Sequence, residues 1–481
     1  METTVLIAIP LGAALALWLV PWRSSVAAGG FALLAALADL AWWVALAGRF
    51  DFGFRDLQFD LHAVWFADLG VSYHVGLFDF SLWLTGLTAL VTVAAVAYGM
   101  WAGRERPGPY FGLILFLAAA TIGVFAAQDL LLFYVFWEAM MIPLYVLIGV
   151  WGGPGRIGAT IRFFIYTMAG SLLMLVSIIV FGLANGTFDM TKLGTNGSAW
   201  IFLGFVAAFA VKAPIWPFHG WLPDAYREAP AEVSALLSGV ISKAAAYGLL
   251  RIAIPYFPDP VADLRVPILT IAAVGLVYGS LLAFRAPDVR GVIAYSSLAQ
   301  LGLIAIGLFA VNDSGLNGAV LQMVNHGLVS TALFLLAGGI ERRTSTGELR
   351  LLGGLARGRP VLASILIAVG VIALAVPGST AFAGEFLVLN GIFTRGWGWS
   401  VVGAVAIVLA AMYVLRLVSA VLHLDPGSAV PEQAYDLRPL EVSVVGSLLA
   451  VLLFLSFWPA AVTDHVFGGR PQATVTSQFQ P

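Results

Sequence analysis

The sequence predicts an all-α integral membrane protein of about fourteen transmembrane helices. Of its 481 residues, 60% are hydrophobic and only 10% are charged, whereas about 25% of the residues of an average soluble domain are charged. A water-soluble fold of this length would need a far more polar surface. Apolar stretches also recur along the whole chain, and most approach the roughly 20 residues that a helix needs to cross a bilayer.

We expect fourteen apolar spans, joined by short connections rich in Gly, Pro, Asp and Arg. The first span has no basic segment before it and further spans follow, so we interpret it as a permanent helix rather than a signal peptide. The predicted spans are residues 4–22, 26–47, 78–100, 110–127, 129–151, 160–184, 199–217, 231–253, 266–284, 290–311, 315–340, 360–376 (continuing brokenly to 394), 399–424 and 439–463.

Residues 48–77 are the exception to this pattern of spans and short connections. Apolar and polar residues alternate there in places, for example at Phe52, Phe54 and Leu57, which is typical of a strand with one exposed face. We therefore expect a small surface hairpin between the second and third spans.

The distribution of basic residues predicts the orientation of the chain. With the N-terminus outside, the inside connections hold fourteen arginines, among them Arg23 and the cluster from Arg342 to Arg359. The outside holds seven Lys and Arg residues, including Arg55 and Arg470. Because short inside loops carry the excess of Lys and Arg, this bias places both termini outside.

Three of the 24 basic residues fall inside spans, namely Lys212, Lys243 and Arg416. A charge at the bilayer centre costs about 2.5–3.5 kcal/mol on insertion scales, so such residues need partners or water. Arg416 stays charged at any accessible pH and suits a structural or field-setting role. Further deep ionisable residues are Glu138, His326, Glu385, Asp39 and Asp79. We expect Asp79 at a helix end, and Asp39 bonded to a neighbouring span or protonated.

Two spans, one in each half of the chain, combine a broken backbone with an ionisable residue. Lys212 is followed by Pro214 and Pro217, and Glu385 follows Val376-Pro377-Gly378. Proline removes a backbone donor and disrupts a helix, and broken helices in transporters mark ion sites between inverted repeats. The alternative for Lys212 is that it reaches an interface, but the preceding residues 208–211 are apolar.

The other deep residues each have a structural and a functional interpretation. Glu138, in the middle of its span, is either a protonated core carboxyl or an ion-pathway residue. Lys243 is flanked by small residues such as Ser238 and Gly239, which allow close helix packing, so it should face neighbouring helices. His326 is either a satisfied core residue or a proton carrier, since imidazole titrates near neutral pH.

Several kinds of chemistry have no support in the sequence. The chain has no cysteine, which excludes disulfides, iron–sulfur clusters and thiolate zinc sites. The six histidines show no metal-binding spacing, and Gly153-Pro-Gly155-Arg-Ile-Gly158 lies in a turn between helices rather than in a dinucleotide-binding unit. The net charge of −2 indicates no nucleic-acid partner. We expect no cofactor and no metal on this chain, and no means to move electrons.

Residues 211–225, Val-Lys-Ala-Pro-Ile-Trp-Pro-Phe-His-Gly-Trp-Leu-Pro-Asp-Ala, resemble the signature of the antiporter-like membrane subunits of respiratory complex I and of multisubunit cation/proton antiporters. The resemblance covers roughly residues 110–420 in order. It continues through Trp137-Glu138, Glu228-Ala229-Pro230, the stretch Ser234–Arg251 with Lys243, Ala294-Tyr295-Ser296-Ser297, Asn325-His326-Gly327-Leu328 and Gly384-Glu385-Phe386.

Within that superfamily the chain resembles the M-type subunits of bacterial NADH–quinone oxidoreductases. The M-like features are the form of His219–Asp224, and Glu385 where sister subunits usually have lysine. The long lateral helix of L-type subunits is not expected. Two positions depart from the M-type pattern, because Tyr226 and Gln300 stand where histidine is common, so neither can carry a proton.

The resemblance implies a proton-translocating subunit that couples NADH:quinone electron transfer elsewhere in a complex to proton pumping in a bacterial plasma membrane. Glu138 and Lys212 would form a switchable ion pair, Lys243 would be the central relay, His326 would pass the proton to Glu385, which connects to the outside, and His219 would be auxiliary. NADH, FMN, iron–sulfur clusters and quinone would be on partner subunits, with L-like and N-like membrane neighbours. The alternative is a subunit of a cation/proton antiporter or a membrane-bound hydrogenase.

The resemblance also implies a division of the chain into an N-terminal three-helix segment, two inverted five-helix repeats that each contain a broken helix, and a C-terminal helix. These parts would cover residues 1–109, 110–253, 266–424 and 439–463.

Overall fold

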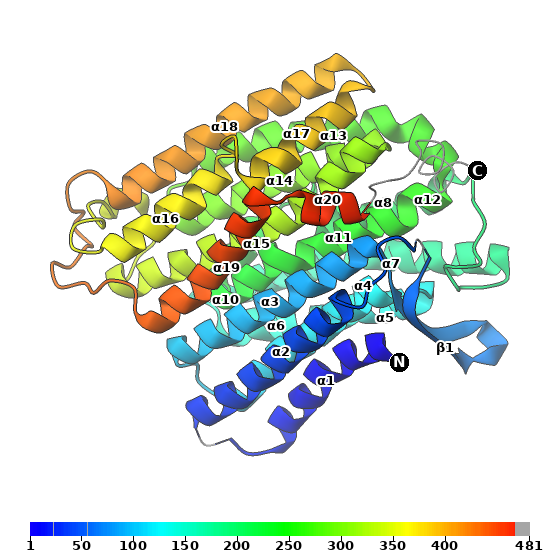
Figure 1. The fold of residues 1–481 in the computed structure, drawn as a ribbon, viewed down its shortest axis with the longest axis horizontal. Coiled ribbons are helices and arrows are strands. Elements are labelled where there is room, and N and C mark those ends of the chain that lie inside the picture. Colours follow the sequence, from blue (N-terminus) through cyan, green and yellow to red (C-terminus); the bar gives the residue numbers. More distant parts are fainter. Residues whose placement is uncertain (23, 55, 467–481) are drawn as a thin grey trace.

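The computed structural model describes residues 1–22, 24–54 and 56–466. Long helices run side by side through the molecule, and a small hairpin projects from the end of the bundle at which the N-terminus lies (Figure 1). Within the described residues, twelve helices are long and apolar enough to cross a membrane, and three shorter apolar helices accompany them. The predicted all-α membrane architecture is therefore confirmed at this level.

The N-terminal part has three long helices and the hairpin. The predicted hairpin is confirmed as an antiparallel pair that holds His62 opposite His74. Asp79 begins the third helix, as expected. The elements are α1 (Glu2–Leu19), α2 (Ser25–Ala47), β1 (Gln58–Phe66), the 3₁₀ turn η1 (Ala67–Leu69), β2 (Val71–Leu77) and α3 (Asp79–Ala102).

The middle of the chain folds into five further crossings, and two of them are interrupted. Their elements are α4 (Pro107–Ala126), α5 (Leu130–Ala139), α6 (Met141–Trp151), α7 (Arg156–Asn185), α8 (Ala199–Lys212), α9 (Leu222–Glu228), α10 (Ala231–Leu236), η2 (Leu237–Ile241), α11 (Ser242–Gly248), η3 (Leu249–Ala253) and α12 (Ile254–Tyr256). The span predicted as continuous over 129–151 breaks at Met140. Pro143 has no N–H to donate to Ala139, four residues earlier, which weakens the helix there.

The C-terminal part repeats the pattern of long helices with one broken crossing. Its elements are α13 (Pro258–Arg285), α14 (Val289–Ala310), α15 (Asp313–Thr344), η4 (Leu349–Leu351), α16 (Pro360–Ala373), α17 (Thr380–Phe393), α18 (Trp397–Leu422), α19 (Pro439–Phe457) and α20 (Ala460–Val466). The helix predicted over 439–463 is instead two helices, because Pro459 stands between α19 and α20.

The most deeply buried helices are α15 and the crossing from α10 to α12, whose apolar windows are completely buried inside the protein. Both lie in the middle of the bundle (Figure 1). Glycine permits their close approach: a Cβ on Gly239 would lie 2.4 Å from Thr331 Oγ1, and one on Gly327 would lie 2.7 Å from the Gly239 carbonyl oxygen. Small residues of this kind let membrane helices pack with their backbones near contact.

Ion pairs join helix termini at the arginine-rich end of the bundle, which the charge bias assigns to the inside. They link Arg104 with Glu232, Arg227 with Asp288, Arg290 with Glu341, and Arg343 with Glu441. The basic residues Arg23, Arg55 and Arg470, which also entered the orientation prediction, lie outside the described residues.

Arg416 and Asp39 have different environments. The Arg416 guanidinium donates to the carbonyl oxygen of Ala286 at 3.0 Å, at the C-terminus of α13, where backbone carbonyls favour a cation. Arg416 therefore caps a neighbouring helix, which fits its expected structural role. Asp39 is buried in α2, and its Oδ1 has no hydrogen-bond partner.

Candidate functional site

Lys212 is the last residue of α8, directly before the first predicted helix break. Turns replace the helix from Ala213 to Trp221, and α9 follows. The indole N–H of Trp221 donates to the carbonyl oxygen of Val211 at 2.9 Å, which satisfies one of the backbone acceptors that a helix end leaves open. Lys212 is only 2% exposed, so it does not reach an interface.

The Lys212 ammonium binds the helix that carries Glu138, but it does not bind Glu138 directly. It donates to the carbonyl oxygen of Trp137 at 3.0 Å and lies 3.9 Å from the centroid of the Trp137 ring, a cation–π contact. Among the contacts of the described residues, the ammonium binds Trp137 and forms no ion pair with Glu138, so the implied pair is not formed in this structure. Glu138 Oε1 is buried without a hydrogen-bond partner.

Lys243 and His326 are in direct contact at the centre of the bundle. Lys243 Nζ lies 2.7 Å from His326 Nδ1, and Lys243 is completely buried. On the other side of the ring, His326 Nε2 lies 3.3 Å from the hydroxyl of Ser297, which in turn lies 2.9 Å from the hydroxyl of Ser238. The contact between Lys243 and His326 joins α11 to α15.

The backbone around Lys243 is π-helical on both sides. The segments η2 and η3 are π-helices that flank α11, and the Lys243 ammonium also donates to the Ser238 carbonyl oxygen within η2. Short π segments within α-helices are frequent at functional sites. Sequence reasoning did not find them, because no side-chain pattern marks them; the small residues around Lys243 predicted only close packing.

Glu385 lies in α17, immediately after the second predicted break, and a chain of amides leads to it. Gln322 Nε2 donates to Gln300 Oε1 at 2.8 Å, and Gln300 Nε2 donates to Glu385 Oε1 at 3.1 Å. Asn325 exchanges hydrogen bonds of 2.7 Å with Thr380 at the start of α17. The spacing of Gln322, Asn325 and His326 on one helix face could have predicted this polar row.

A cavity of about 40 Å³ connects His326 with Glu385. Its polar lining includes Gln300, Gln322 and Tyr413 besides these two residues. A buried water needs roughly 10–15 Å³ of such volume and two to four polar partners, so the cavity can hold two or three waters between the imidazole and the carboxyl group.

The structure thus brings together three of the predicted residues, Lys243, His326 and Glu385, and places Glu138 near Lys212. Among the contacts of the described residues, none joins Lys212 directly to Lys243. His219 lies in the break after α8, partly exposed, with its ring edge-on to Tyr278 of α13 at 5.4 Å.

The two positions where histidine is common in M-type chains have separate roles here. Gln300 lies within the amide chain beside Glu385. Tyr226 is buried and packs edge-on against Phe334 at 5.4 Å.

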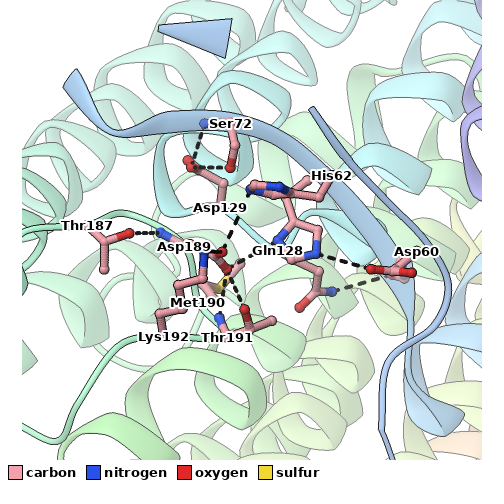
Figure 2. Close-up of polar contacts among 12 residues, drawn as sticks. Asp60, His62, Ser72, Gln128, Asp129, Thr187, Asp189, Met190, Thr191 and Lys192 are labelled. Atoms are coloured by element: carbon pink, nitrogen blue, oxygen red, sulfur yellow. Dashed lines mark hydrogen bonds and ion pairs between the residues drawn. The ribbon is translucent and has the colours of Figure 1, made fainter. Parts of the chain in front are cut away.

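Sequence reasoning also missed a group of side chains around the hairpin. Figure 2 shows Asp189, from the loop between α7 and α8, close to His62 of the hairpin. The cross-strand partner of His62 is His74. A search for metal spacings along the chain cannot find such a group, because a hairpin register and a distant loop create it.

Known proteins match this chain along most of its length. The sequence profile described as "NADH:quinone oxidoreductase/Mrp antiporter" matches residues 127–410. Subunit M of the NADH-quinone oxidoreductase of Rhodobacter capsulatus is 35% identical over an alignment of 480 positions that covers 95% of this chain and 93% of that protein. NAD(P)H-quinone oxidoreductase chain 4 3 of Trichormus variabilis is 35% identical over 96% of this chain and 89% of its own length.

Solved structures share the fold. A chain of respiratory complex I from Thermus thermophilus superimposes with a TM-score of 0.89 and 27% identity, and the match covers 100% of both chains. A chain of the Mrp complex from Dietzia has a TM-score of 0.87 at 20% identity over 99% of both chains, a likeness of fold alone. The chain therefore belongs to the NADH:quinone oxidoreductase/Mrp antiporter family of membrane subunits.

Proposed function

We propose that this chain is the proton-translocating M-type subunit of a respiratory NADH–quinone oxidoreductase. The observation that carries the proposal is the polar route Lys243–His326–cavity–Glu385 through the most buried part of the bundle. Ionisable groups at membrane depth are costly and are retained for ion movement. Similarity to M subunits at 35% identity over nearly the whole chain supports the choice of complex.

In the proposed mechanism, Lys243 is the central proton carrier. The direct contact between its ammonium and His326 Nδ1 lets a proton move from one nitrogen to the other. From His326, the waters that the cavity accommodates would pass the proton to Glu385. Gln300 holds the Glu385 carboxyl group in place but does not carry a proton.

Lys212 and Glu138 would form the switch that drives this route. Moving one charge against 100 mV costs about 2.3 kcal/mol, so pumping against roughly 150–200 mV needs about 3.5–4.6 kcal/mol per proton. An exposed ion pair cannot supply that energy, because its net strength is about 0–1 kcal/mol, whereas breaking a buried pair involves about 3–5 kcal/mol. Lys212 is buried and near Glu138 without pairing, which suits an open state of such a switch. His219, in the break after α8, would assist there.

The arrangement of helices supports the proposed pair of inverted five-helix repeats and a total of fourteen crossings. In each half the fourth crossing is broken, α8 with α9 in the first half and α16 with α17 in the second, although the second crossing of the first half is also interrupted, at Met140. The third crossing is the longest in both halves, with 30 residues in α7 and 32 in α15. The repeats would cover residues 110–253 and 266–424, after the N-terminal segment 1–109 and before the C-terminal helix 439–463.

The proposal places the redox chemistry on other chains. NADH, FMN, the iron–sulfur clusters and quinone would bind partner subunits, and L-like and N-like membrane subunits would be the neighbours of this chain. It would lie in a bacterial plasma membrane with both termini outside. The ion pairs between helix termini at the arginine-rich end support that orientation, because basic residues favour the inside.

The alternative is a subunit of a cation/proton antiporter or a membrane-bound hydrogenase, which needs the same proton route but no quinone. This alternative is compatible with the fold, because a chain of an Mrp complex has the same fold. The substrate that drives proton movement distinguishes the proposal from this alternative. An NADH–quinone oxidoreductase pumps protons when NADH is supplied, whereas a cation/proton antiporter would respond to a sodium or potassium gradient.

The first test is NADH-driven proton uptake in inverted membrane vesicles that carry Glu138→Ala, Lys212→Ala or Lys212→Arg. We expect each variant to lose most of its uptake, the arginine variant included, because arginine keeps the charge but does not release a proton. Two measurements check that the complex is assembled: the rate of NADH oxidation with an artificial electron acceptor, and native gel electrophoresis. Both should give the wild-type result in these variants.

Glu432→Ala is the matched control, because Glu432 is exposed in the loop between α18 and α19, and its uptake should equal that of the wild type. Normal uptake in Glu138→Ala or Lys212→Ala would refute the assigned switch. Uptake driven by a sodium gradient but not by NADH would replace the proposal with the antiporter.

A further inference from the structure

Two histidines and one aspartate converge where the hairpin meets the loop between α7 and α8. His62, His74 and Asp189 each offer one ligand atom, and these atoms all lie within 4.8 Å of one another. Figure 2 shows Asp189 facing the hairpin beside His62. The group lies apart from the proposed proton route, and none of its members has a role in that mechanism.

The hairpin register and the loop fix the relative positions of these side chains. His62 and His74 are directly opposite on β1 and β2, and their ring centroids are 4.8 Å apart. His74 Nδ1 lies 3.1 Å from Asp189 Oδ1, and His62 Nε2 lies 3.9 Å from Asp189 Oδ2. His74 and Asp189 are buried, whereas the His62 side chain is 40% exposed, so the group is open to solvent on one side.

Hydrogen bonds hold the Asp189 carboxylate in position. The backbone N–H and the hydroxyl of Thr191 donate to Asp189 Oδ1 at 3.0 and 2.7 Å. The backbone of Met190 is bonded to Gln128 beside the start of α5.

The ring nitrogen of His74 that does not face Asp189 has no hydrogen-bond partner. His74 Nε2 is buried, and the nearest carboxylate oxygen, on Asp60, is 3.8 Å away. An orphaned buried nitrogen costs free energy. With a metal on Nδ1, the Nε2 proton would point towards Asp60, which is the carboxylate–histidine–metal arrangement common around zinc.

We propose that His62, His74 and Asp189 bind a zinc-type divalent transition-metal cation. Two imidazoles and one carboxylate with a free fourth position form a typical open zinc site. Ligands about 2.0–2.1 Å from a tetrahedral ion are about 3.3 Å apart. His74 Nδ1 and Asp189 Oδ1 are 3.1 Å apart, which is already close to this separation. His62 Nε2 is 3.9 Å from Asp189 Oδ2, so the exposed His62 side chain has to move closer to the carboxylate. Ca²⁺ and Mg²⁺ prefer oxygen ligands and fit poorly.

Lys192 competes for the same carboxylate. Its ammonium lies 3.2 Å from Asp189 Oδ2, but its side chain is 64% exposed and can turn towards solvent. A bound cation would displace it, and the repulsion between the two charges would weaken metal binding. Removal of the lysine charge should therefore tighten binding, which is a gain that general damage to the fold would not produce.

The bound metal would join the hairpin to the α7–α8 loop. These two segments are more than 100 residues apart in the sequence, and the metal would add a cross-link to the hydrogen bonds between them. Binding of this kind requires neither the proposed proton route nor the proposed partners, so its failure would leave the proposed function intact.

The test uses the purified native assembly after treatment with a chelator, followed by titration with ZnCl₂. Zinc retained after gel filtration is measured by mass spectrometry, and thermal unfolding is measured in parallel. We expect the wild type to retain one zinc per chain more than His62→Ala, His74→Ala or Asp189→Asn, whose affinity should fall at least about tenfold. Lys192→Met should bind several-fold more tightly than the wild type.

His423→Ala is the matched control, because His423 is an exposed histidine in the loop after α18, and its zinc binding should equal that of the wild type. MgCl₂ and CaCl₂ should not shift the unfolding temperature. Equal zinc content in the wild type and His62→Ala, together with no gain in Lys192→Met, would refute the site. The His62 and Lys192 side chains are both exposed, so His62→Ala and Lys192→Met should leave the assembly folded. Their zinc binding therefore tests the site without interference from misfolding.

Discussion

Gln300 joins two polar side chains along the proposed proton route. It accepts a hydrogen bond from Gln322 and donates one to Glu385. An amide does not gain or lose protons near neutral pH, so in the proposed route the glutamine would position the carboxyl group while the cavity between His326 and Glu385 would provide the room for transfer.

Replacement of Gln300 should therefore affect proton transfer through Glu385. Gln300→Leu removes the donor to Glu385 and leaves Gln322 without its acceptor, at a cost of about 1–3 kcal/mol for the unsatisfied buried groups. We expect NADH-driven proton uptake in inverted vesicles to fall at least severalfold. Gln300→His, which keeps a donor, should retain most of it. Equal uptake in the leucine and histidine variants would contradict a positioning role.

At the scale of single residues, the sequence predicted which ionisable residues lie deep in the spans but not their contacts. Lys212, Lys243 and Glu385 are identifiable because a charge in an apolar span has a high cost. The partners come from other helices: Trp137 for Lys212, His326 for Lys243 and Gln300 for Glu385. The expected pair of Glu138 with Lys212 is not among the contacts of the described residues, because Lys212 binds Trp137 instead.

At the scale of elements, the start of α16 is capped by a residue from a distant loop. Asp436 accepts hydrogen bonds from the backbone N–H groups of Val361 and Leu362, both at 2.9 Å. These are donors that the first turn of a helix cannot satisfy internally. Burial alone would raise the pKa of Asp436, but these backbone hydrogen bonds outweigh it and hold that pKa below its ordinary value of 3.8.

The lowered pKa of Asp436 predicts a pH-dependent contribution to stability. A carboxylate with a depressed folded-state pKa stabilises the protein fully above its ordinary value of 3.8, and this stabilisation is lost as the pH falls through the depressed value. Asp436→Ala should lower the stability at pH 7 by about 0.5–2 kcal/mol, as the loss of a helix cap does. The difference from the wild type should shrink below pH 4. Thermal unfolding of the purified assembly from pH 3 to 7 measures it, and a constant difference over this range would contradict the role of the charge.

The breaks in the helices divide into those that proline marks and those that it does not. The interruptions after Lys212 and before Glu385 follow from proline and glycine in the sequence, as does the break between α19 and α20. The π segment η2 before Lys243 has no such mark, whereas η3 ends two residues before Pro255. Packing against α15, where Gly239 meets Thr331 and Gly327, accompanies the altered backbone there.

At the scale of the whole molecule, a buried ion pair connects the second half of the bundle with the C-terminal helix. Arg343 at the end of α15 binds both carboxylate oxygens of Glu441 in α19, at 2.9 and 2.8 Å. The exposed fractions of the two side chains are 0% and 3%. The guanidinium also donates to the carbonyl oxygens of Tyr435 and Asp436, so it ties the last connecting loop to the bundle.

Removal of one partner of this pair should destabilise the assembly strongly. Arg343→Ala leaves Glu441 buried and uncompensated, which costs about 3–5 kcal/mol. The double substitution Arg343→Met with Glu441→Leu should recover much of the loss, because it removes both charges together. Thermal unfolding of the purified assembly measures both variants. Arg357→Ala is the control: its pair with Asp425 is exposed, so its unfolding should not change. A double variant less stable than Arg343→Ala would contradict this account.

The sequence by itself determined the membrane class, the approximate spans, the hairpin, two helix breaks and the ionisable residues at depth. These features follow from local composition and from the cost of polar groups in hydrocarbon. Only the tertiary structure decided which of these residues meet. Contacts between Lys243 and His326, the cavity that reaches Glu385, and the approach of His62, His74 and Asp189 all join segments far apart in the chain. Such contacts depend on how the helices and the hairpin pack, which no local pattern specifies.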